Sequence, residues 1–273
     1  MRRIANDPHT FYNGSLANDI VSDLKDGGGI ITLQDLKNYT TKIKTPLNIT
    51  LKINNEILTV YSPPPPASGA VILFMLNVLK GYHWSNDTLA TLSGRVLTFH
   101  RIAETFKFAY ARRSQLGDED FVDISQLLAN LTNDVYATNI RKLITDAKTQ
   151  KLSYYGGAFE ARGGLGTTHI NVLAQDGGAV AITSTINTSF GSKVFGSKTG
   201  IIFNNEMDDF STPGTVNSYG VPASPTNFIA PGKRPMSSTC PTLILDDAGN
   251  VRLATGAPGG TRITTNTAWV RAN

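Results

Sequence analysis

A change in the spacing of apolar residues, near residue 158, constrains most strongly what this chain can fold into. Upstream, apolar residues recur every three or four positions, as in 97–111, which is typical of amphipathic helices. Downstream they alternate with polar residues, as in 169–174, which is typical of strands. The segment between the two patterns, 158–166, is rich in glycine and predicts a flexible, exposed linker. We therefore expect an α+β protein with a boundary in this linker.

Each side of the boundary has its own predicted elements. Upstream, the pattern predicts strands within 47–61 and helices at 13–24, 70–80, 97–111 and 134–148. Downstream it predicts two hairpins, the first with both strands buried, at 169–174 with 179–186 and at 242–245 with 251–255. The polar stretch between the hairpins, 187–239, has little regular pattern, and a loop of that length inside a compact domain is usually functional or disordered. Its Asn, Glu, Asp and paired Ser residues favour a functional loop.

The composition excludes several classes of protein. Of the 273 residues, 40% are hydrophobic and 17% are charged, which indicates a globular chain long enough for a sizeable core. The net charge of +4 comes without a run of basic residues, so nucleic acid is not an expected partner. Cys240 is the only cysteine, so no disulfide can form within the chain.

Asparagine-linked glycosylation motifs are frequent and favour a protein of the secretory pathway. Such tripeptides begin at Asn13, Asn38, Asn48, Asn86, Asn130 and Asn187. The chain opens without an apolar signal segment, and its longest apolar run, 70–79, is too short to span a bilayer. We therefore expect neither a signal nor an anchor within these residues.

Signatures of metal-dependent and serine hydrolases are missing from the sequence. The four histidines are scattered and no His-Glu-x-x-His motif occurs, so no metal is expected. No Gly-x-Ser-x-Gly motif occurs either, which argues against the nucleophile elbow of α/β-hydrolases.

Thr167 is the strongest remaining candidate for a nucleophile, because it follows the glycine-rich linker and opens a predicted strand. A threonine in that place is ordinary, since β-branched residues favour strands, and a structural role is the default. If the chain is cut before Thr167, the freed α-amine, with a reference pKa of about 8, can act as base for its own hydroxyl. Gly166 suits such a cut because no side chain would obstruct the attacked carbonyl.

Three downstream clusters fit a site, although each also has a plain structural explanation. The glycines of 256–260 could turn backbone N–H groups toward a developing oxyanion, or could form a simple turn. The carboxylates of 205–210 could bind an ammonium group, or could lie in a solvated loop. Ser237 and Ser238 could bind a carboxylate through hydroxyl and backbone donors, although paired serines are common.

In order and spacing, these segments resemble the γ-glutamyltransferase family. Its small-subunit motifs are matched by Gly166-Thr-Thr-His, Thr185-Ile-Asn, Phe190-Gly-Ser, Asn204-Asn-Glu-Met-Asp-Asp-Phe, Pro231-Gly-Lys-Arg-Pro-Met-Ser-Ser and Gly256-Ala-Pro-Gly-Gly-Thr-Arg-Ile. The C-terminal part of its large subunit is matched by Phe11-Tyr-Asn-Gly-Ser, Tyr61-Ser-Pro-Pro-Pro and Phe106-Lys-Phe-Ala-Tyr-Ala-Arg-Arg. The resemblance covers essentially the whole chain.

The resemblance implies a fold and a division of the chain. The fold would be the four-layer αββα sandwich of N-terminal-nucleophile hydrolases, here incomplete. Residues 1–166 would be the C-terminal part of the large-subunit region, ending in the linker. Residues 167–273 would be the small-subunit catalytic region, truncated at its C-terminus. The two segments of one precursor would form a heterodimer. The full-length protein would be secreted or lie on the outer face of the plasma membrane.

The resemblance also implies the chemistry. The precursor would cleave itself between Gly166 and Thr167 by an N→O acyl shift, and Thr167 would then attack the γ-glutamyl amide of glutathione or a related donor. The γ-glutamyl group would pass to water, an amino acid or a dipeptide, with no cofactor. Thr185 would assist the nucleophile and the processing step. Backbone amides of Gly259 and Gly260 would form the oxyanion hole.

The implied donor site matches the chemistry of a zwitterion, which needs acceptors for its ammonium group and donors for its carboxylate. Asn187, Glu206 and Asp209 would hold the α-amino group, and Ser237 and Ser238 would bind the α-carboxylate. A carboxylate normally also takes a bidentate arginine.

That arginine is the main departure from the family pattern. In the family it lies upstream of the part that this chain matches, and none of Arg2, Arg3, Arg112 and Arg113 falls in its motif. Two interpretations therefore stay open. One is part of an enzyme that cleaves γ-glutamyl amides. The other is a non-catalytic paralogue that acts as a binding or interaction protein.

Overall fold

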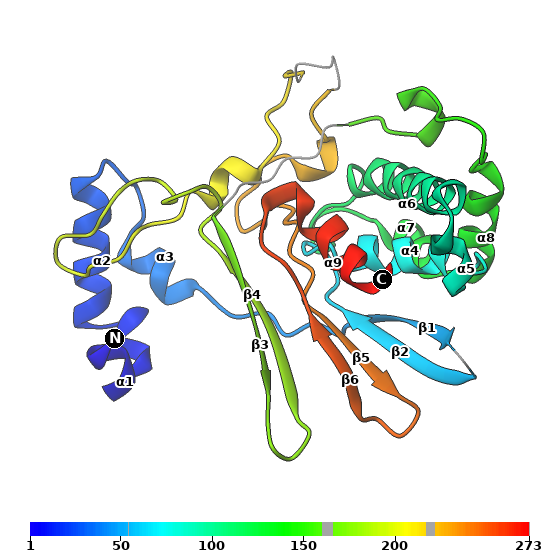
Figure 1. Cartoon of the computed structure of the whole chain (residues 1–273). Coiled ribbons are helices and arrows are strands. Elements are labelled where there is room, and N and C mark those ends of the chain that lie inside the picture. The colour runs from blue at the N-terminus through cyan, green and yellow to red at the C-terminus, as the bar shows by residue number, and fades with distance from the viewer. Residues whose placement is uncertain (54, 160–165, 217–221, 273) are drawn as a thin grey trace.

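A computed structural model describes residues 1–53, 55–159, 166–216 and 222–272 of the chain. Most helices gather on one face of a four-stranded antiparallel sheet, while a separate two-stranded hairpin lies beside the edge strand of that sheet (Figure 1). The N-terminal helices stand apart from both (Figure 1). No helix within the described ranges is long and apolar enough to cross a membrane.

The four-stranded sheet joins segments from both sides of the predicted boundary. Its strand order is β1-β2-β5-β6, with bounds Leu47–Ile53, Glu56–Ser62, Thr242–Asp246 and Val251–Thr255. Strand β2 pairs with β5 so that Val60 faces Ile244, and both side chains are fully buried. The strands predicted within 47–61 and the hairpin predicted at 242–255 are therefore confirmed.

Helix α4, Gly69–Leu79, forms the centre of the core. Every one of its residues is buried, because the helix packs on β1 and β2 and is itself covered by α6, α8 and α9. A helix that is apolar on all sides is stable only in such an enclosed place. The predicted buried helix at 70–80 is confirmed.

Helices α6, Leu92–Arg113, and α8, Asp134–Leu143, cover α4. The helix predicted at 97–111 is confirmed and begins earlier, at a Thr91 cap whose hydroxyl accepts the Gly94 N–H. The helix predicted at 134–148 is wrong in its C-terminal part. Its last residues leave the helix because Asp146 pairs with Arg101 at 2.7 Å and the carbonyl of Thr145 bonds the His100 ring at 2.7 Å.

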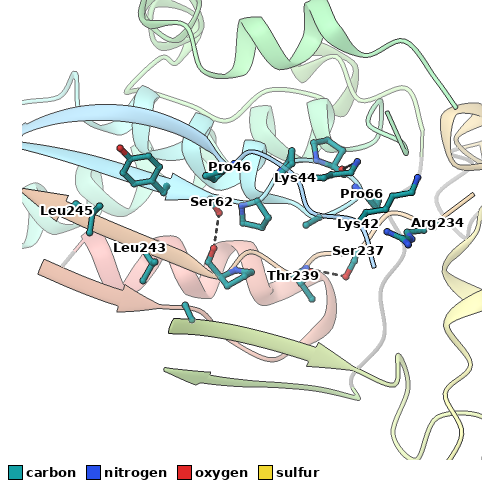
Figure 2. Close-up of a pocket in the computed structure, with 17 residues that line it drawn as sticks. Lys42, Lys44, Pro46, Ser62, Pro66, Arg234, Ser237, Thr239, Leu243 and Leu245 are labelled. Atoms are coloured by element: carbon teal, nitrogen blue, oxygen red, sulfur yellow. Dashed lines mark hydrogen bonds between the residues drawn. The ribbon is translucent and has the colours of Figure 1, made fainter. Parts of the chain in front are cut away.

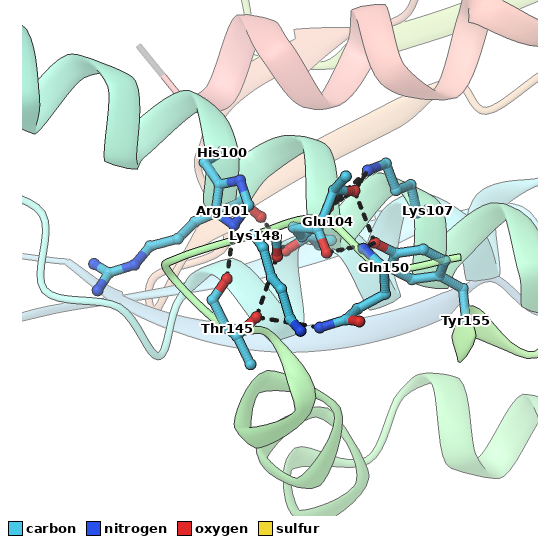
Figure 3. A network of polar contacts seen from close by, with 10 residues as sticks. His100, Arg101, Glu104, Lys107, Thr145, Lys148, Gln150 and Tyr155 are labelled. Atoms are coloured by element: carbon cyan, nitrogen blue, oxygen red, sulfur yellow. Dashed lines mark hydrogen bonds and ion pairs between the residues drawn. The ribbon is translucent and has the colours of Figure 1, made fainter. Parts of the chain in front are cut away.

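The buried carboxylate of Glu104 holds the segment before the linker, residues 149–155, in place (Figure 3). Glu104 of α6 is 1% exposed and accepts hydrogen bonds from the Tyr155 hydroxyl at 2.6 Å, the Thr149 hydroxyl at 2.8 Å and the Lys107 ammonium at 2.7 Å. Burial acts to raise the pKa of Glu104, but these donors outweigh it and leave the pKa below its usual value. The ionised carboxylate therefore holds 149–155 against α6.

The second sheet is the hairpin of β3, Thr167–Leu173, and β4, Ala179–Thr185. The prediction of a hairpin here is confirmed, but the prediction that its strands are buried is wrong. Ile170 and Ile182 are 56% and 48% exposed, and Val172 and Val180 are also exposed. Within the described residues the hairpin pairs only with itself, so nothing covers most of its apolar side chains.

The N-terminal helices contact the long loop after β4. Helices α1, α2 and α3 span Arg2–Asn6, Ser15–Asp26 and Leu33–Asn38, which confirms the helix predicted at 13–24. The carboxylate of Asp23 in α2 accepts the backbone N–H groups of Lys198 and Thr199 at 3.1 and 3.0 Å. Within its described part, the loop 187–239 contains isolated β-bridges and short 3₁₀ turns, the latter at Glu206–Asp209 and Pro225–Asn227.

The remaining helices complete the cover of the sheet. Helices α5, α7 and α9 span Asn86–Ala90, Ser125–Leu131 and Ile263–Ala272. Short 3₁₀ turns lie at Pro8–Phe11, Leu152–Tyr155 and Gly260–Arg262. Most of the predicted glycine-rich linker, 160–165, lies outside the described residues.

Candidate active site

Thr167 is the first residue of β3 and faces Thr185, the last residue of β4. The Thr167 hydroxyl donates to the Thr185 hydroxyl over 3.0 Å, and Thr185 also accepts the Asn187 N–H at 2.8 Å. With both acceptor positions in use, the Thr185 proton is directed to the Gly166 carbonyl, 3.4 Å away. The two threonines predicted to act together are therefore in direct contact.

The Gly166 carbonyl, at the predicted cleavage position, lies between two donors. It accepts the backbone N–H of Ile186 at 3.0 Å and the weaker bond from the Thr185 hydroxyl. A Cβ at Gly166 would overlap the carbonyl of Thr188, so only glycine fits there. Donors on a carbonyl oxygen stabilise the negative charge that develops when a nucleophile attacks its carbon.

Asn187 follows this pair and is 3% exposed, with a left-handed φ of 69°. Its side-chain NH₂ donates to the Asn205 carbonyl at 3.1 Å, while its side-chain oxygen has no hydrogen-bond partner among the described residues. A buried acceptor without a donor is costly, and an ammonium group would satisfy it. The bond to Asn205 also brings Asn187 beside the turn that contains Glu206.

Glu206 and Asp209 lie on one 3₁₀ turn, with Asp209 buried. Burial, together with the nearby charge of Asp209, raises the pKa of Glu206 to about 7. One carboxylate oxygen of Glu206 is buried and lacks a hydrogen-bond partner among the described residues. Two adjacent carboxyl groups, one buried and one half-buried, favour a cation between them, because a positive charge removes their mutual repulsion.

Ser237 and Ser238 lie beside the start of α4. The Ser237 backbone N–H donates to the Pro66 carbonyl at 2.8 Å, and the Ser237 carbonyl accepts the Ser68 hydroxyl at 2.6 Å. The Ser238 hydroxyl accepts a bond of 2.9 Å from the guanidinium of Arg113, which is 3% exposed. Sequence reasoning excluded Arg113 as the expected carboxylate ligand and missed this contact.

Gly259 and Gly260 both have left-handed φ angles, 123° and 60°, so this segment requires glycine. Gly256, at the start of the same loop, lies against the ring of His169, where a Cβ would overlap the imidazole. The loop therefore begins beside β3, two residues from Thr167. The Tyr110 hydroxyl anchors its far end through the Thr261 carbonyl and the Thr264 hydroxyl.

A chain of contacts thus runs from Thr167 to the serines. It passes through Thr185 and Asn187 to the turn with Glu206 and Asp209, and Arg113 then joins Asp209 electrostatically and Ser238 by a hydrogen bond. No hydrogen bond joins Gly259 or Gly260 to Thr167 among the described residues. In the same part of the chain, no three His, Cys, Asp or Glu side chains gather as a metal site would require.

A pocket of about 650 Å³ lies next to Ser237, between the four-stranded sheet and the hairpin (Figure 2). Its walls are mainly prolines and the half-buried face of the sheet, including Tyr61 and Leu243. Lys42 and Lys44 line it as well, but they already pair with Asp120 and Glu119.

The Gamma-glutamyltranspeptidase family model matches residues 1–273 of this sequence. The chain belongs to the γ-glutamyltranspeptidase family. It is 40% identical to glutathione hydrolase 2 of Arabidopsis thaliana over 271 residues, and 46% identical to Scoloptoxin SSD14 of Scolopendra dehaani over 256 residues. These alignments cover 97% and 94% of this chain but only 45% and 44% of the two relatives. The chain therefore spans less than half the length of these family members.

A solved structure supports the fold of the γ-glutamyltranspeptidase match. Cephalosporin acylase from Bacillus halodurans aligns with 100% of this chain and 45% of its own, with a TM-score of 0.78 and 25% sequence identity. The expected α+β class of the N-terminal-nucleophile type is confirmed by this neighbour.

Proposed function

We propose that the full-length protein, meaning this chain within a polypeptide of the length of its relatives, is a γ-glutamyltransferase and glutathione hydrolase with Thr167 as nucleophile. The observation that carries the proposal is the Gly166–Thr167 junction, where one hydroxyl, that of Thr185, contacts both the nucleophile and the carbonyl to be attacked. Relatives named glutathione hydrolase supply the substrate class.

Processing is the first proposed step. The Thr167 oxygen attacks the Gly166 carbonyl carbon while the Ile186 N–H and the Thr185 hydroxyl stabilise the oxyanion. The C–N bond breaks, the nitrogen gains a proton, and an ester joins Gly166 to the Thr167 oxygen. Water hydrolyses this ester, which leaves a carboxylate on Gly166 and a free α-amine and hydroxyl on Thr167.

Turnover then uses the freed amine as base. It takes the hydroxyl proton of Thr167, whose oxygen forms an ester with the γ-carbonyl of the donor, and the proton goes to the departing amine. Water, an amino acid or a dipeptide attacks the ester and restores the hydroxyl. The backbone N–H groups of Gly259 and Gly260 are the proposed oxyanion donors, and no cofactor takes part.

The donor's head group would lie between the cluster that contains the two carboxyl groups and the paired serines. Asn187, Glu206 and Asp209 present buried acceptors to its ammonium group. Ser237 and Ser238 present donors to its carboxylate. The full-length protein would consist of a large segment ending at Gly166 and a small segment starting at Thr167, held together as a heterodimer.

The full-length protein is proposed to pass through the secretory pathway. Asn13, Asn38 and Asn48, each in a glycosylation tripeptide, are exposed, whereas Asn187 is buried and is not expected to carry a glycan. We place the protein on the outer face of the plasma membrane or outside the cell.

Self-cleavage and donor hydrolysis test the proposal directly. Expressed at full length, the protein should yield a small subunit whose first residue is Thr167, and it should release the anilide from a γ-glutamyl anilide. Thr167→Ala should abolish both, while Thr168→Ala should retain both. A small subunit starting at any other residue would refute the assignment.

A non-catalytic role is the second candidate, and the 46% identity to a protein named as a toxin favours testing it. A binding protein of this family would need no cleavage before Thr167. A folded full-length protein that stays intact and leaves γ-glutamyl anilides unchanged would support this candidate over the enzyme.

A further inference from the structure

Arg113, the last residue of α6, is buried in an unusual place for an arginine. It is 3% exposed, and burial lowers the pKa of its guanidinium, although an arginine stays charged. A buried charge is costly unless it is paired and hydrogen-bonded. Its surroundings therefore show what the charge is used for.

The guanidinium contacts three segments that meet at the predicted donor site. One nitrogen donates to the Ser238 hydroxyl at 2.9 Å, and Nε donates to the Ser68 hydroxyl at 3.3 Å. The charge is also attracted by the carboxylate of Asp209. Arg113 thus lies between the residues proposed for the donor's carboxylate and those proposed for its ammonium group.

The hydrogen bonds around Arg113 have a defined direction, because a guanidinium can only donate. The Ser68 hydroxyl accepts a hydrogen bond from Arg113 and donates one to the Ser237 carbonyl, at 2.6 Å. Ser238 accepts from Arg113 as well, but its proton has no partner among the described hydrogen bonds. The Ser238 hydroxyl is therefore held with its proton pointing away from Arg113 and available for a ligand.

We propose that Arg113 is a positioning residue for the donor's α-carboxylate, acting through Ser238 rather than by contact. The bond to Arg113 orients Ser238 as a hydrogen-bond donor, and the positive charge behind the hydroxyl strengthens that bond. This inference rests on the proposed function, since it assigns a role within that donor site.

Kinetics with two donors in the full-length protein test the role. One donor is a γ-glutamyl anilide, and the other is the 4-aminobutyryl anilide, which lacks only the α-carboxylate. Arg113→Met should still self-cleave, and its KM for the γ-glutamyl anilide should rise about tenfold, the loss expected for one charge-assisted bond, with kcat changed far less. Its kcat/KM for the 4-aminobutyryl anilide should stay within about twofold of wild type, since the mean error of such a comparison is a few tenths of a kcal/mol.

Three further variants separate positioning from simple stability. Ser238→Ala should show the same split between donors, and the double variant should be no worse than Ser238→Ala alone, because both changes remove one interaction. Arg113→Lys should recover part of the affinity. The control is Arg101→Met, which removes an arginine of α6 whose ion pair with Asp146 is on the surface and should leave both donors unaffected.

Equal losses with both donors, or additive losses in the double variant, would overturn the role of Arg113. If Arg113→Met does not fold, Arg113→Lys and Ser238→Ala test the role in the same way, by whether the γ-glutamyl anilide is affected more than the 4-aminobutyryl anilide. A wild-type protein that neither self-cleaves nor cleaves either donor would instead refute the proposed function itself.

Discussion

The two sheets of this protein have the same local pattern and opposite surroundings. The four-stranded sheet has one face buried by α4, where Val60 and Ile244 are 0% exposed. The hairpin β3–β4 carries apolar residues at the same spacing, yet Ile170 and Val172 remain about half exposed. Both are antiparallel and both end in tight turns. What differs is whether another element lies against them.

The difference teaches where stability and chemistry reside. Helix α4 and the sheet beneath it supply the buried apolar area on which folding depends. The hairpin supplies the hydroxyls of Thr167 and Thr185 and contributes little burial. Substitutions in the two regions should therefore affect different measurements.

The largest effect is expected from Ile72→Ala in α4. The side chain is 0% exposed in the centre of the core, so its truncation leaves a cavity and should cost about 2–5 kcal/mol of unfolding free energy. Urea unfolding of the chain measures this. A cost below about 1 kcal/mol would mean that α4 is not the centre of the core.

Thr185→Ala should act on chemistry instead. It removes the hydroxyl that contacts both Thr167 and the Gly166 carbonyl, and loss of one such donor slows acyl transfer about 100-fold. The rate of self-cleavage, followed on denaturing gels of the full-length protein, measures it. Thr183→Ala is the matched control on the same strand, because that hydroxyl bonds His169 and not Gly166. Similar slowing in both variants would contradict the specific role.

The pH dependence of donor binding reports on the turn beside the hairpin. The pKa of Glu206 is raised to about 7, and an ammonium ligand favours the ionised form, so KM for a γ-glutamyl donor should fall as pH rises from about 6 to 8, by up to tenfold per unit. Glu206→Gln should remove this dependence, whereas Asp208→Asn, at an exposed neighbour, should keep it.

The free energy of unfolding should fall as pH rises, whereas donor binding improves, and both effects come from the raised pKa of Glu206. A carboxyl group with a folded-state pKa raised above its unfolded value of 4.5 stabilises the fold fully below pH 4.5. That contribution is lost as pH rises through about 7. The free energy of unfolding of Glu206→Gln, compared with wild type between pH 4.5 and 8, should lack this decline. A parallel decline in both would assign it to other groups.

The smallest effect is expected from Ile182→Ala on β4, which repeats the chemical change of Ile72→Ala at a side chain that is 48% exposed. Without a covering element the loss should stay below about 1 kcal/mol in urea unfolding, reflecting mainly strand propensity. A cost equal to that of Ile72→Ala would show that the hairpin is covered in solution, and would remove the contrast between the two sheets.

The local sequence pattern is sufficient to predict the helices and strands, but not whether they are buried. An apolar run broken only by Asn77 predicts α4, and period-two alternation predicts both hairpins, since these depend on neighbouring residues. Burial of the hairpin cannot be obtained in this way, because it depends on what lies against Ile170 and Ile182. The end of α8 was missed for a related reason. Contacts of Thr145 and Asp146 with α6, 45 residues away in sequence, outweigh the local helical pattern.

The candidate site shows the same limit. Thr167 and Thr185 were predicted to act together through the family resemblance, and they are in contact. Arg113 was not assigned a role, because its bond to Ser238 joins residues 125 positions apart. Only the packing of α6 against the segment 237–239 brings them together, and nothing in the spacing of the sequence indicates it.

The pairing of β2 with β5 has a consequence for the proposed cleavage. The bond between Gly166 and Thr167 lies between these strands in sequence, so each product of cleavage would contribute two strands to one sheet, with Val60 paired opposite Ile244. The two subunits would not fold separately and then associate. They would form one folded domain in which a single peptide bond has been cleaved. Separating them would require breaking the β2–β5 pairing, so we expect the cleaved protein to dissociate only when it unfolds.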